Sequence, residues 1–140
     1  MDNHVSIRFL GIPDNESFAR SVVAAFCIPC DPSIEVLNDI RTSVSEAVTN
    51  CIVHGYGEKQ GDVLIDAVIK DNVLTVNIVD YGKGIVNVEK VMEDFYTSMP
   101  GEERSGLGFT IMKTFMDELD VKSSLGQGTT VTMVKRLHNA

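Results

Sequence analysis

Three polar residues, Glu46, Asn50 and His54, recur at intervals of four near the middle of the chain. Because an α-helix turns by about 100° per residue, side chains at this spacing share one face. An acid, an amide and an imidazole in one stripe could position a hard cation and a reacting hydroxyl group. A solvated helix face is the alternative, and this helix alone does not separate the two interpretations.

Glycine-containing segments favour the chemical interpretation. Asp80-Tyr81-Gly82-Lys83-Gly84 ends an expected strand, Gly106-Leu107-Gly108 opens an expected helix, and Gly126-Gln127-Gly128-Thr129 joins the last two strands. Glycine allows close approach of backbone to a ligand, and the free amides of a helix N-terminus attract anions. Arg104 could hold a phosphate in two hydrogen bonds, and Asp80 could accept one from an exocyclic amine. Together these features predict a site for a purine nucleoside triphosphate.

Other nucleotide motifs do not fit. The segment from Gly101 to Gly106 has the glycine spacing of a P-loop, but Leu107 stands where that motif needs Lys. Neither Gly82-x-Gly84 nor Gly106-x-Gly108 has a third glycine three residues later, so the dinucleotide-binding fingerprint is missing. The glycine-loop and catalytic-loop signatures of ordinary protein kinases are missing as well.

The elements that must position these residues follow from hydrophobic periodicity. Alternation predicts strands near 5–9, 63–69, 73–79, 121–124 and 129–135, and helical spacing predicts helices over 16–26, 33–53, 86–92 and 107–117. We expect Asn15 to cap the first helix and Asp31 to start the second. The first helix should bury Phe18, Val22 and the pair at 25 and 26. A tight turn is expected at Asp71-Asn72. The second helix should have an apolar stripe, made of Leu37, Ile40, Val44, Ala47, Val48 and Cys51. The segment 93–105 has no clean period and is expected to be a mobile loop.

This order of elements favours an α+β sandwich, with helices on one face of a sheet, formed by residues 1–140 as one domain. Lys plus Arg number 12 and Asp plus Glu number 20, which gives a net charge of −8. That balance argues against direct binding to nucleic acid, which needs clustered basic residues. The chain has no run long enough to span a bilayer and no export signal, so we expect no membrane association and a cytoplasmic location.

Two smaller features allow more than one interpretation. Cys27-Ile28-Pro29-Cys30 is formally a C-x-x-C motif, but no second ligand pair accompanies it, so two small structural residues are expected rather than a metal or redox site. Glu16 and Arg20 stand four apart on the first helix. They are expected either to form part of a partner-binding surface or to be a simple solvated ion pair.

At this point the sequence resembles a known superfamily. Glu46 to Asn50, Asp80 to Gly84 and Gly106 to Gly108 are similar to the N, G1 and G2 boxes of the GHKL ATPases, which include gyrase and the histidine kinases. Residues 15–20, 44–50, 54–56 and 103–112 further resemble the anti-sigma serine/threonine kinases of endospore-forming bacteria. The resemblance runs nearly from end to end.

The resemblance implies a fold, an activity and partners. The fold would be a two-layer helix-over-sheet sandwich of the GHKL (Bergerat) type, with a mixed, mostly antiparallel sheet. The protein would be a homodimer that binds ATP or ADP with Mg²⁺. It would inhibit a sporulation sigma factor of the sigma F type. It would also phosphorylate a serine of an anti-anti-sigma protein, which then dissociates.

The resemblance also implies residue roles. Glu46 matches the catalytic base and Asn50 the Mg²⁺ ligand, while Asp80 matches the residue that recognises adenine. The nucleotide would be enclosed by further positions, which are His54, Gly82, Gly84, Arg104, Ser105, Gly106, Leu107, Gly108 and Thr129. Among these, Thr129 matches the residue that supports the contact between Asp80 and the base.

Three alternatives stay open at this stage. The chain could be a nucleotide-sensing anti-sigma module without significant turnover, in which ADP and ATP select the partner. It could be the anti-sigma kinase of a stress-response sigma factor. It could be the catalytic half of a histidine kinase, although no phosphoacceptor helix is evident, because His4 and His138 are near the termini and His54 is in the nucleotide helix.

Overall fold

The computed structural model describes residues 2–85, 87–93 and 108–138. Strands and helices follow one another in the expected order, and two short non-α turns, η1 and η2, flank the second helix. The elements are β1 (Asn3–Leu10), α1 (Asp14–Cys27), η1 (Ile28–Cys30), α2 (Ile34–Asn50), η2 (Cys51–Tyr56), β2 (Asp62–Lys70), β3 (Val73–Asp80), α3 (Val88–Val91), α4 (Gly108–Phe115), β4 (Glu118–Ser124) and β5 (Gly128–Arg136).

The strands form one sheet in the order β1-β2-β3-β5-β4. Every pair of neighbouring described strands is antiparallel, so the sheet is not mixed as the resemblance implied. Asp71 and Asn72 both have positive φ, 53° and 63°, which is the geometry of a tight turn between β2 and β3. The predicted α+β sandwich is therefore confirmed, with a purely antiparallel sheet across the described residues.

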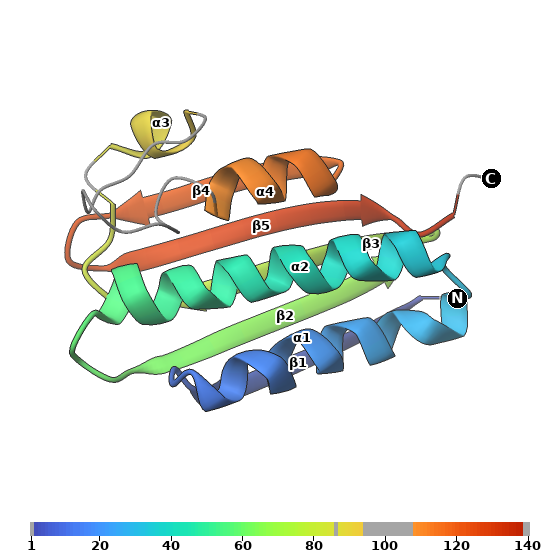
Figure 1. The fold of residues 1–140 in the computed structure, drawn as a ribbon, viewed down its shortest axis with the longest axis horizontal. Coiled ribbons are helices and arrows are strands. Elements are labelled where there is room, and N and C mark those ends of the chain that lie inside the picture. The colour runs from blue at the N-terminus through green and yellow to red at the C-terminus, as the bar shows by residue number, and fades with distance from the viewer. Residues whose placement is uncertain (1, 86, 94–107, 139–140) are drawn as a thin grey trace.

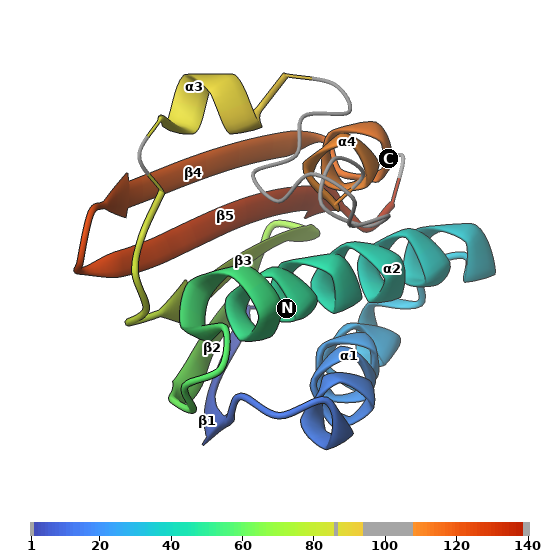
Figure 2. The ribbon, with the colours of Figure 1, turned by 60° about the vertical axis from the view of Figure 1, so that its left-hand side comes forward.

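Helices α1, α2 and α4 lie over the same face of the sheet, with α2 across its middle (Figures 1 and 2). The predicted apolar stripe of α2 is confirmed. Its members are Leu37, Ile40, Val44, Ala47, Val48 and Cys51, all of which are buried against the inward-facing residues of the strands. A hydrophobic layer of this kind holds the helix and the strands that border the candidate site in fixed relation. Within the described ranges, no helix is both long and apolar enough to cross a bilayer.

The buried face of α1 differs from the prediction. The helix buries Ala19, Val23, Ala24 and Cys27, whereas Phe18 is 53% exposed. The predicted stripe, which began at Phe18, is therefore displaced by one residue from the actual contact. Small side chains fit the close approach of α1 to α2, so the larger Phe18 is left on the outer surface.

Two predicted helix caps are wrong. Asn15 is inside α1, and its side-chain amide donates to the carbonyl of Leu10 at 2.9 Å, which ties the helix to β1. Ser33, not Asp31, caps α2 by accepting a hydrogen bond from Val36 N at 3.1 Å. Asp31 instead has a left-handed conformation at the end of η1.

The predicted second helix changes character after Asn50. Residues Cys51–Tyr56 form a turn of π-helix, η2, and Gly57 N donates to Ile52 O five residues earlier at 3.1 Å. Such wide turns are rare and are found frequently at functional sites. Here the wider turn brings Gly55 against the end of β3, where Asp80 lies. The short third helix is confirmed over Val88–Val91.

Candidate functional site

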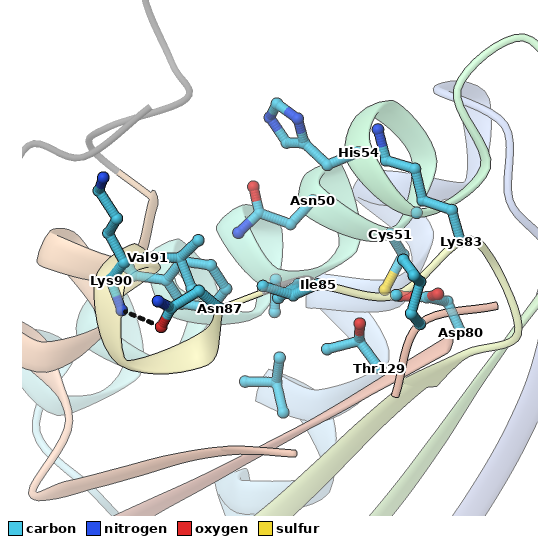
Figure 3. Close-up of a pocket in the computed structure, with 16 residues that line it drawn as sticks. Asn50, Cys51, His54, Asp80, Lys83, Ile85, Asn87, Lys90, Val91 and Thr129 are labelled. Carbon is cyan, nitrogen blue, oxygen red and sulfur yellow. Dashed lines mark hydrogen bonds between the residues drawn. The ribbon is translucent and has the colours of Figure 1, made fainter. Parts of the chain in front are cut away.

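A cavity of about 590 Å³ opens between α2, η2, α3 and the ends of β3 and β5. Its volume lies in the range of small-molecule sites, which is about 300–1,000 Å³. Five of its lining residues come from the predicted site, namely Asn50, His54, Asp80, Gly84 and Thr129. Segments separated by about 80 residues in the sequence therefore contribute to one pocket (Figure 3).

Asp80, the last residue of β3, forms the buried end of this cavity. The residue is only 4% exposed. Burial raises the pKa of its carboxyl group, while hydrogen bonds from the Gly82 backbone, the Cys51 side chain and the Thr129 backbone oppose that shift. Gly82 N donates to Asp80 Oδ1 at 2.9 Å. A buried carboxylate held in this way is an acceptor suited to an amino group on a ligand.

Two glycines make room for this carboxylate. A Cβ atom added to Gly55 would lie 2.8 Å from Cγ of Asp80, closer than real Cβ contacts allow. A Cβ added to Gly82 would overlap the carbonyl of Gly55, which already accepts a hydrogen bond from Lys83 N at 2.9 Å. The backbone of η2 and the loop after β3 thus touch directly, and only glycine permits that contact.

Gly84 and Gly128 fix the same loop against the β4–β5 hairpin. Both have positive φ, 78° and 99°, and a side chain on either would overlap backbone of the neighbouring segment. Gly126 N donates to Lys83 O at 2.6 Å, which closes the contact. Gly84 lines the cavity, whereas Gly82 is not among its lining residues, and the role of both in shaping a nucleotide pocket stays a prediction.

The opposite side of the cavity is polar. Asn50 and His54 point into it from the end of α2 and from η2 (Figure 3). Gly108, the first residue of α4, lies against Asn50, since a Cβ there would be 3.1 Å from the amide nitrogen. Glu46 is one turn before Asn50 and is partly exposed, but it is not among the cavity-lining residues. Of the three residues in the predicted polar stripe, Asn50 and His54 therefore line the pocket and Glu46 does not.

Two lysines in the cavity wall were not given a role by the sequence. Lys83 lies between the two glycines of the loop after β3, and Lys90 is in α3. Cationic side chains around a pocket, in a protein with a net charge of −8, favour an anionic ligand. The signal for Lys83 was its place between Gly82 and Gly84, whereas nothing in the spacing indicated Lys90.

The donor set permits a magnesium nucleotide. Asn50 supplies an amide oxygen to the cavity, and the described residues contain no cluster of three His, Cys, Asp or Glu side chains that could hold a metal alone. Mg²⁺ typically takes one or two protein ligands and completes its shell with water and phosphate oxygens. A site with one amide oxygen, nearby lysines and a deep acceptor fits a magnesium-bound nucleotide better than a resident metal.

The remaining predicted residues are distributed as follows. Arg104, Ser105, Gly106 and Leu107 lie outside the described residues. The predicted ion pair on α1 is formed, with Arg20 Nη1 3.6 Å from Glu16 Oε1. Glu16 is not simply solvated, because the hydroxyl of Ser45 on α2 also donates to it.

The three cysteines are free and buried. Burial, followed by the neighbouring Cys30, raises the pKa of Cys27 to about 12, so its thiolate is scarce at neutral pH. Cys51 was not predicted to belong to the site, yet it lines the cavity beside Asp80 (Figure 3). Burial and then Asp80 raise its pKa well above the usual range, so it remains a protonated donor.

Known proteins share this architecture. The family model of a histidine kinase-like ATPase domain matches residues 13–135. An anti-sigma F factor of Caldanaerobacter subterraneus subsp. tengcongensis is 54% identical over 134 residues, which cover 96% of this chain and 94% of that protein. An anti-sigma F factor of Clostridium acetobutylicum is 50% identical over 136 residues, covering 97% and 95% of the two chains.

Solved structures agree at the level of the fold. The RsbU and RsbW domains of Rv1364c from Mycobacterium tuberculosis superpose with a TM-score of 0.71 at 17% identity, covering 99% of this chain and 33% of that one. The mycobacterial sensor histidine kinase MprB superposes with a TM-score of 0.58 at 22% identity, covering 95% and 97%. The family model over residues 13–135 confirms the predicted relationship to the GHKL ATPases, and the solved structures show the same fold.

Proposed function

The chain belongs to the histidine kinase-like ATPase family and, within it, to the anti-sigma F factors, and on that premise we propose that it inhibits a sporulation sigma factor and phosphorylates a serine of an anti-anti-sigma protein. As a member of this family it binds ATP or ADP. The observation that supports the proposal most strongly is the shared cavity. It has the buried carboxylate of Asp80 at one end and Asn50 with His54 at the other.

The base would occupy the end beside Asp80, and the phosphates would lie toward Asn50, His54 and the lysines. Asp80 accepts from an exocyclic amine there, while Lys83 and Lys90 offset phosphate charge. Magnesium, when bound with the nucleotide, would neutralise charge on the phosphates, with Asn50 as its protein ligand. His54 would pack against the phosphate side.

Glu46 is proposed as the general base. It lies one helical turn from Asn50, is partly exposed and is not among the cavity-lining residues, so the proposal puts it where the protein substrate would reach the edge of the cavity. The carboxylate takes the proton of the incoming serine hydroxyl as that oxygen bonds to the γ-phosphorus. The bond to the β,γ-bridging oxygen breaks, and ADP leaves. Phosphoryl transfer needs chiefly this alignment and charge neutralisation.

For residues 94–107 the proposal rests on the sequence alone. Arg104, Ser105, Gly106 and Leu107 are proposed to surround the phosphates, together with Gly108 at the start of α4. Residues 1–140 are proposed to act as a single kinase domain that functions as a cytoplasmic homodimer.

The outer surface of α1 is proposed to contact the protein partners. Phe18 is 53% exposed, and Arg20, on another face of α1, has 43% of its side chain exposed. Glu16 joins this surface to α2, because it contacts both Arg20 and Ser45. Arg20 is thus held beside the partly buried Glu16, and cationic and aromatic side chains are both enriched in binding hot spots.

The test is transfer of radiolabelled phosphate from ATP to a candidate anti-anti-sigma protein. We expect an acid-stable phosphoserine on that protein with the native chain, and loss of transfer with Glu46→Gln or Asn50→Ala. Glu35→Gln, an exposed change in the first turn of the same helix, serves as the matched control and should transfer normally. Normal transfer by Glu46→Gln would refute its role.

Two further outcomes separate the alternative functions. Partner exchange between ADP and ATP without any phosphoprotein would indicate a nucleotide-sensing module. An acid-labile phosphate on a histidine would indicate a histidine kinase. Pull-down of sigma factors by the native chain with ADP and with ATP would distinguish a sporulation target from a stress-response target.

A further inference from the structure

Ser123 on β4 stands at the centre of a hydrogen-bond network behind the base-binding end of the cavity. Its hydroxyl accepts from Ile85 N at 2.7 Å and donates to Gly128 O at 2.8 Å. It also lies 2.9 Å from the hydroxyl oxygen of Thr129, its partner across the β4–β5 ladder. The residue is half-buried, and no motif in the sequence indicated it.

The hydrogen-bonding groups around Ser123 determine which hydroxyl donates in the bond between Ser123 and Thr129. A serine hydroxyl has one proton, a carbonyl can only accept, and a backbone amide can only donate. Because the proton of Ser123 goes to Gly128 O, the bond between the two hydroxyls must use the proton of Thr129. Thr129 therefore offers only lone pairs to the cavity that it lines.

Asp80 also offers only hydrogen-bond acceptors to the cavity. It is the register partner of Thr129 across β3 and β5, and its carboxylate receives hydrogen bonds from Gly82 N and from Cys51. Both side chains at this end of the cavity are thus acceptors. A base that presents an amino group meets them favourably, whereas a base with a carbonyl oxygen brings acceptor against acceptor.

We propose that Ser123 is a positioning residue for base selection. It accepts a hydrogen bond from the Thr129 hydroxyl, so that this hydroxyl can only accept a hydrogen bond from the bound base. This inference rests on the proposed nucleotide site and adds a specificity element to it. Without Ser123, the hydroxyl of Thr129 rotates freely and donates to a carbonyl oxygen. The discrimination between amino and oxo purines is then reduced.

The experiment compares ADP with IDP, which differ in the amino and oxo groups of the base. Dissociation constants of both, with Mg²⁺, are measured by calorimetry for the native chain, Ser123→Ala and Ser123→Thr. We expect the native preference for ADP to fall by at least about fivefold in Ser123→Ala, the scale of one hydrogen bond. Tighter IDP binding should account for part of this change. Ser123→Thr keeps the hydroxyl and should retain the native ratio.

An equal loss of affinity for both nucleotides in Ser123→Ala would overturn the inference, because Ser123 would then only support the loop through Ile85. Thr129→Val is an independent test that does not alter Ser123. It should reduce the ratio by weakening ADP rather than by strengthening IDP, and an unchanged ratio would also overturn the inference. A native chain that binds ADP and IDP equally refutes base selection alone, whereas a native chain that binds neither refutes the nucleotide site as well.

Discussion

Gly108 and Asn50, 58 positions apart in the sequence, are in direct contact at the polar side of the cavity. The Cα of Gly108 faces the carboxamide so closely that a Cβ would be 3.1 Å from Nδ2 and 3.3 Å from Oδ1. The start of α4 therefore sets the position of the proposed magnesium ligand. This contact links the two motif regions that the sequence could only place in order.

Gly108→Ala should displace the Asn50 side chain by a few tenths of an ångström. Because misplacement of a positioning group by such amounts is costly to catalysis, we expect phosphoryl transfer to fall by roughly 10- to 100-fold. ADP affinity in the absence of Mg²⁺ should change little, since Asp80 at the other end is untouched. Single-turnover transfer and calorimetry provide the two measurements, and unchanged transfer would contradict the proposed importance of this contact.

Gly82→Ala should abolish nucleotide binding, because its Cβ would overlap the backbone of Gly55 beneath Asp80. Gly126→Ala is the matched control. Gly126 also has a positive φ, 79°, but a Cβ there meets nothing within 4 Å. The control should lose only about 1 kcal/mol of stability to backbone strain and should still bind ADP. Fluorescence titration with a labelled ADP distinguishes the two, and equal affinities would contradict the steric explanation.

On acidification, ADP affinity should begin to fall at a higher pH than it would if the pKa of Asp80 were that of an ordinary Asp. Burial raises the pKa of Asp80, and the carboxylate form is the one that accepts from the base. Below that raised pKa the affinity should fall by up to about tenfold per pH unit. Calorimetry across a pH series measures this, and a flat profile in that range would argue against Asp80 as the contact.

The stability of the nucleotide-free protein should show the opposite dependence. Between the ordinary and the raised pKa of Asp80, the folded state binds more protons than the unfolded state. The contribution of Asp80 to the free energy of unfolding is therefore greatest below this window and decreases as the pH rises through it. Asp80→Asn lacks this contribution, so the difference in unfolding free energy between the two proteins should change across the window in urea denaturation.

Lys135 connects three elements beneath the helical layer. Its ammonium lies 3.1 Å from Asp39 Oδ2 on α2 and donates to Phe115 O at the end of α4 at 2.5 Å. Its side chain is 12% exposed and that of Asp39 is 21% exposed. Lys135→Ala should lower the unfolding free energy by about 2–4 kcal/mol, because it leaves both acceptors largely desolvated. The exposed Arg8→Ala serves as a control and should cost under about 1 kcal/mol in urea denaturation.

Phe18→Ala and Arg20→Glu should each weaken binding to the protein partners and leave ADP affinity unchanged. Phe18 is an exposed aromatic residue, and truncation of such an anchor commonly costs tenfold or more in affinity. Ile28→Ala is a matched control, since Ile28 is equally exposed at 53% but lies beyond the end of α1. Surface plasmon resonance with each partner provides the measurement, and an equal effect of the control would contradict a surface confined to α1.

Much of the fold could be predicted because periodic burial follows the chain locally. The stripe of α2 and the turn at Asp71 and Asn72 were both predicted correctly from spacing and turn chemistry. The face of α1 was not, because Phe18 is more hydrophobic than Ala19 but too large for the close contact with α2. Packing between two helices thus overrode the ranking of individual residues.

The candidate site was likewise predicted only in part. Residue type and spacing pointed to Asn50, His54 and Asp80, and the family resemblance added roles for Gly84 and Thr129. All five line one cavity. Helical periodicity also grouped Glu46 with Asn50, but Glu46 is not among the lining residues. Cys51, Lys90 and Ser123 were missed, because each acquires its role from neighbours on other elements.

By itself the sequence determined which side chains could do chemistry, since residue type and local spacing are properties of the chain. Tertiary structure alone decided which of them meet, because antiparallel register places Asp80 opposite Thr129 and the wide turn η2 brings Gly55 against Asp80. It also determined which group donates in each hydrogen bond: Thr129 donates to Ser123, and Cys51 donates to Asp80. Hydrogen bonding and desolvation depend on distance in space, and no spacing along the chain encodes that distance.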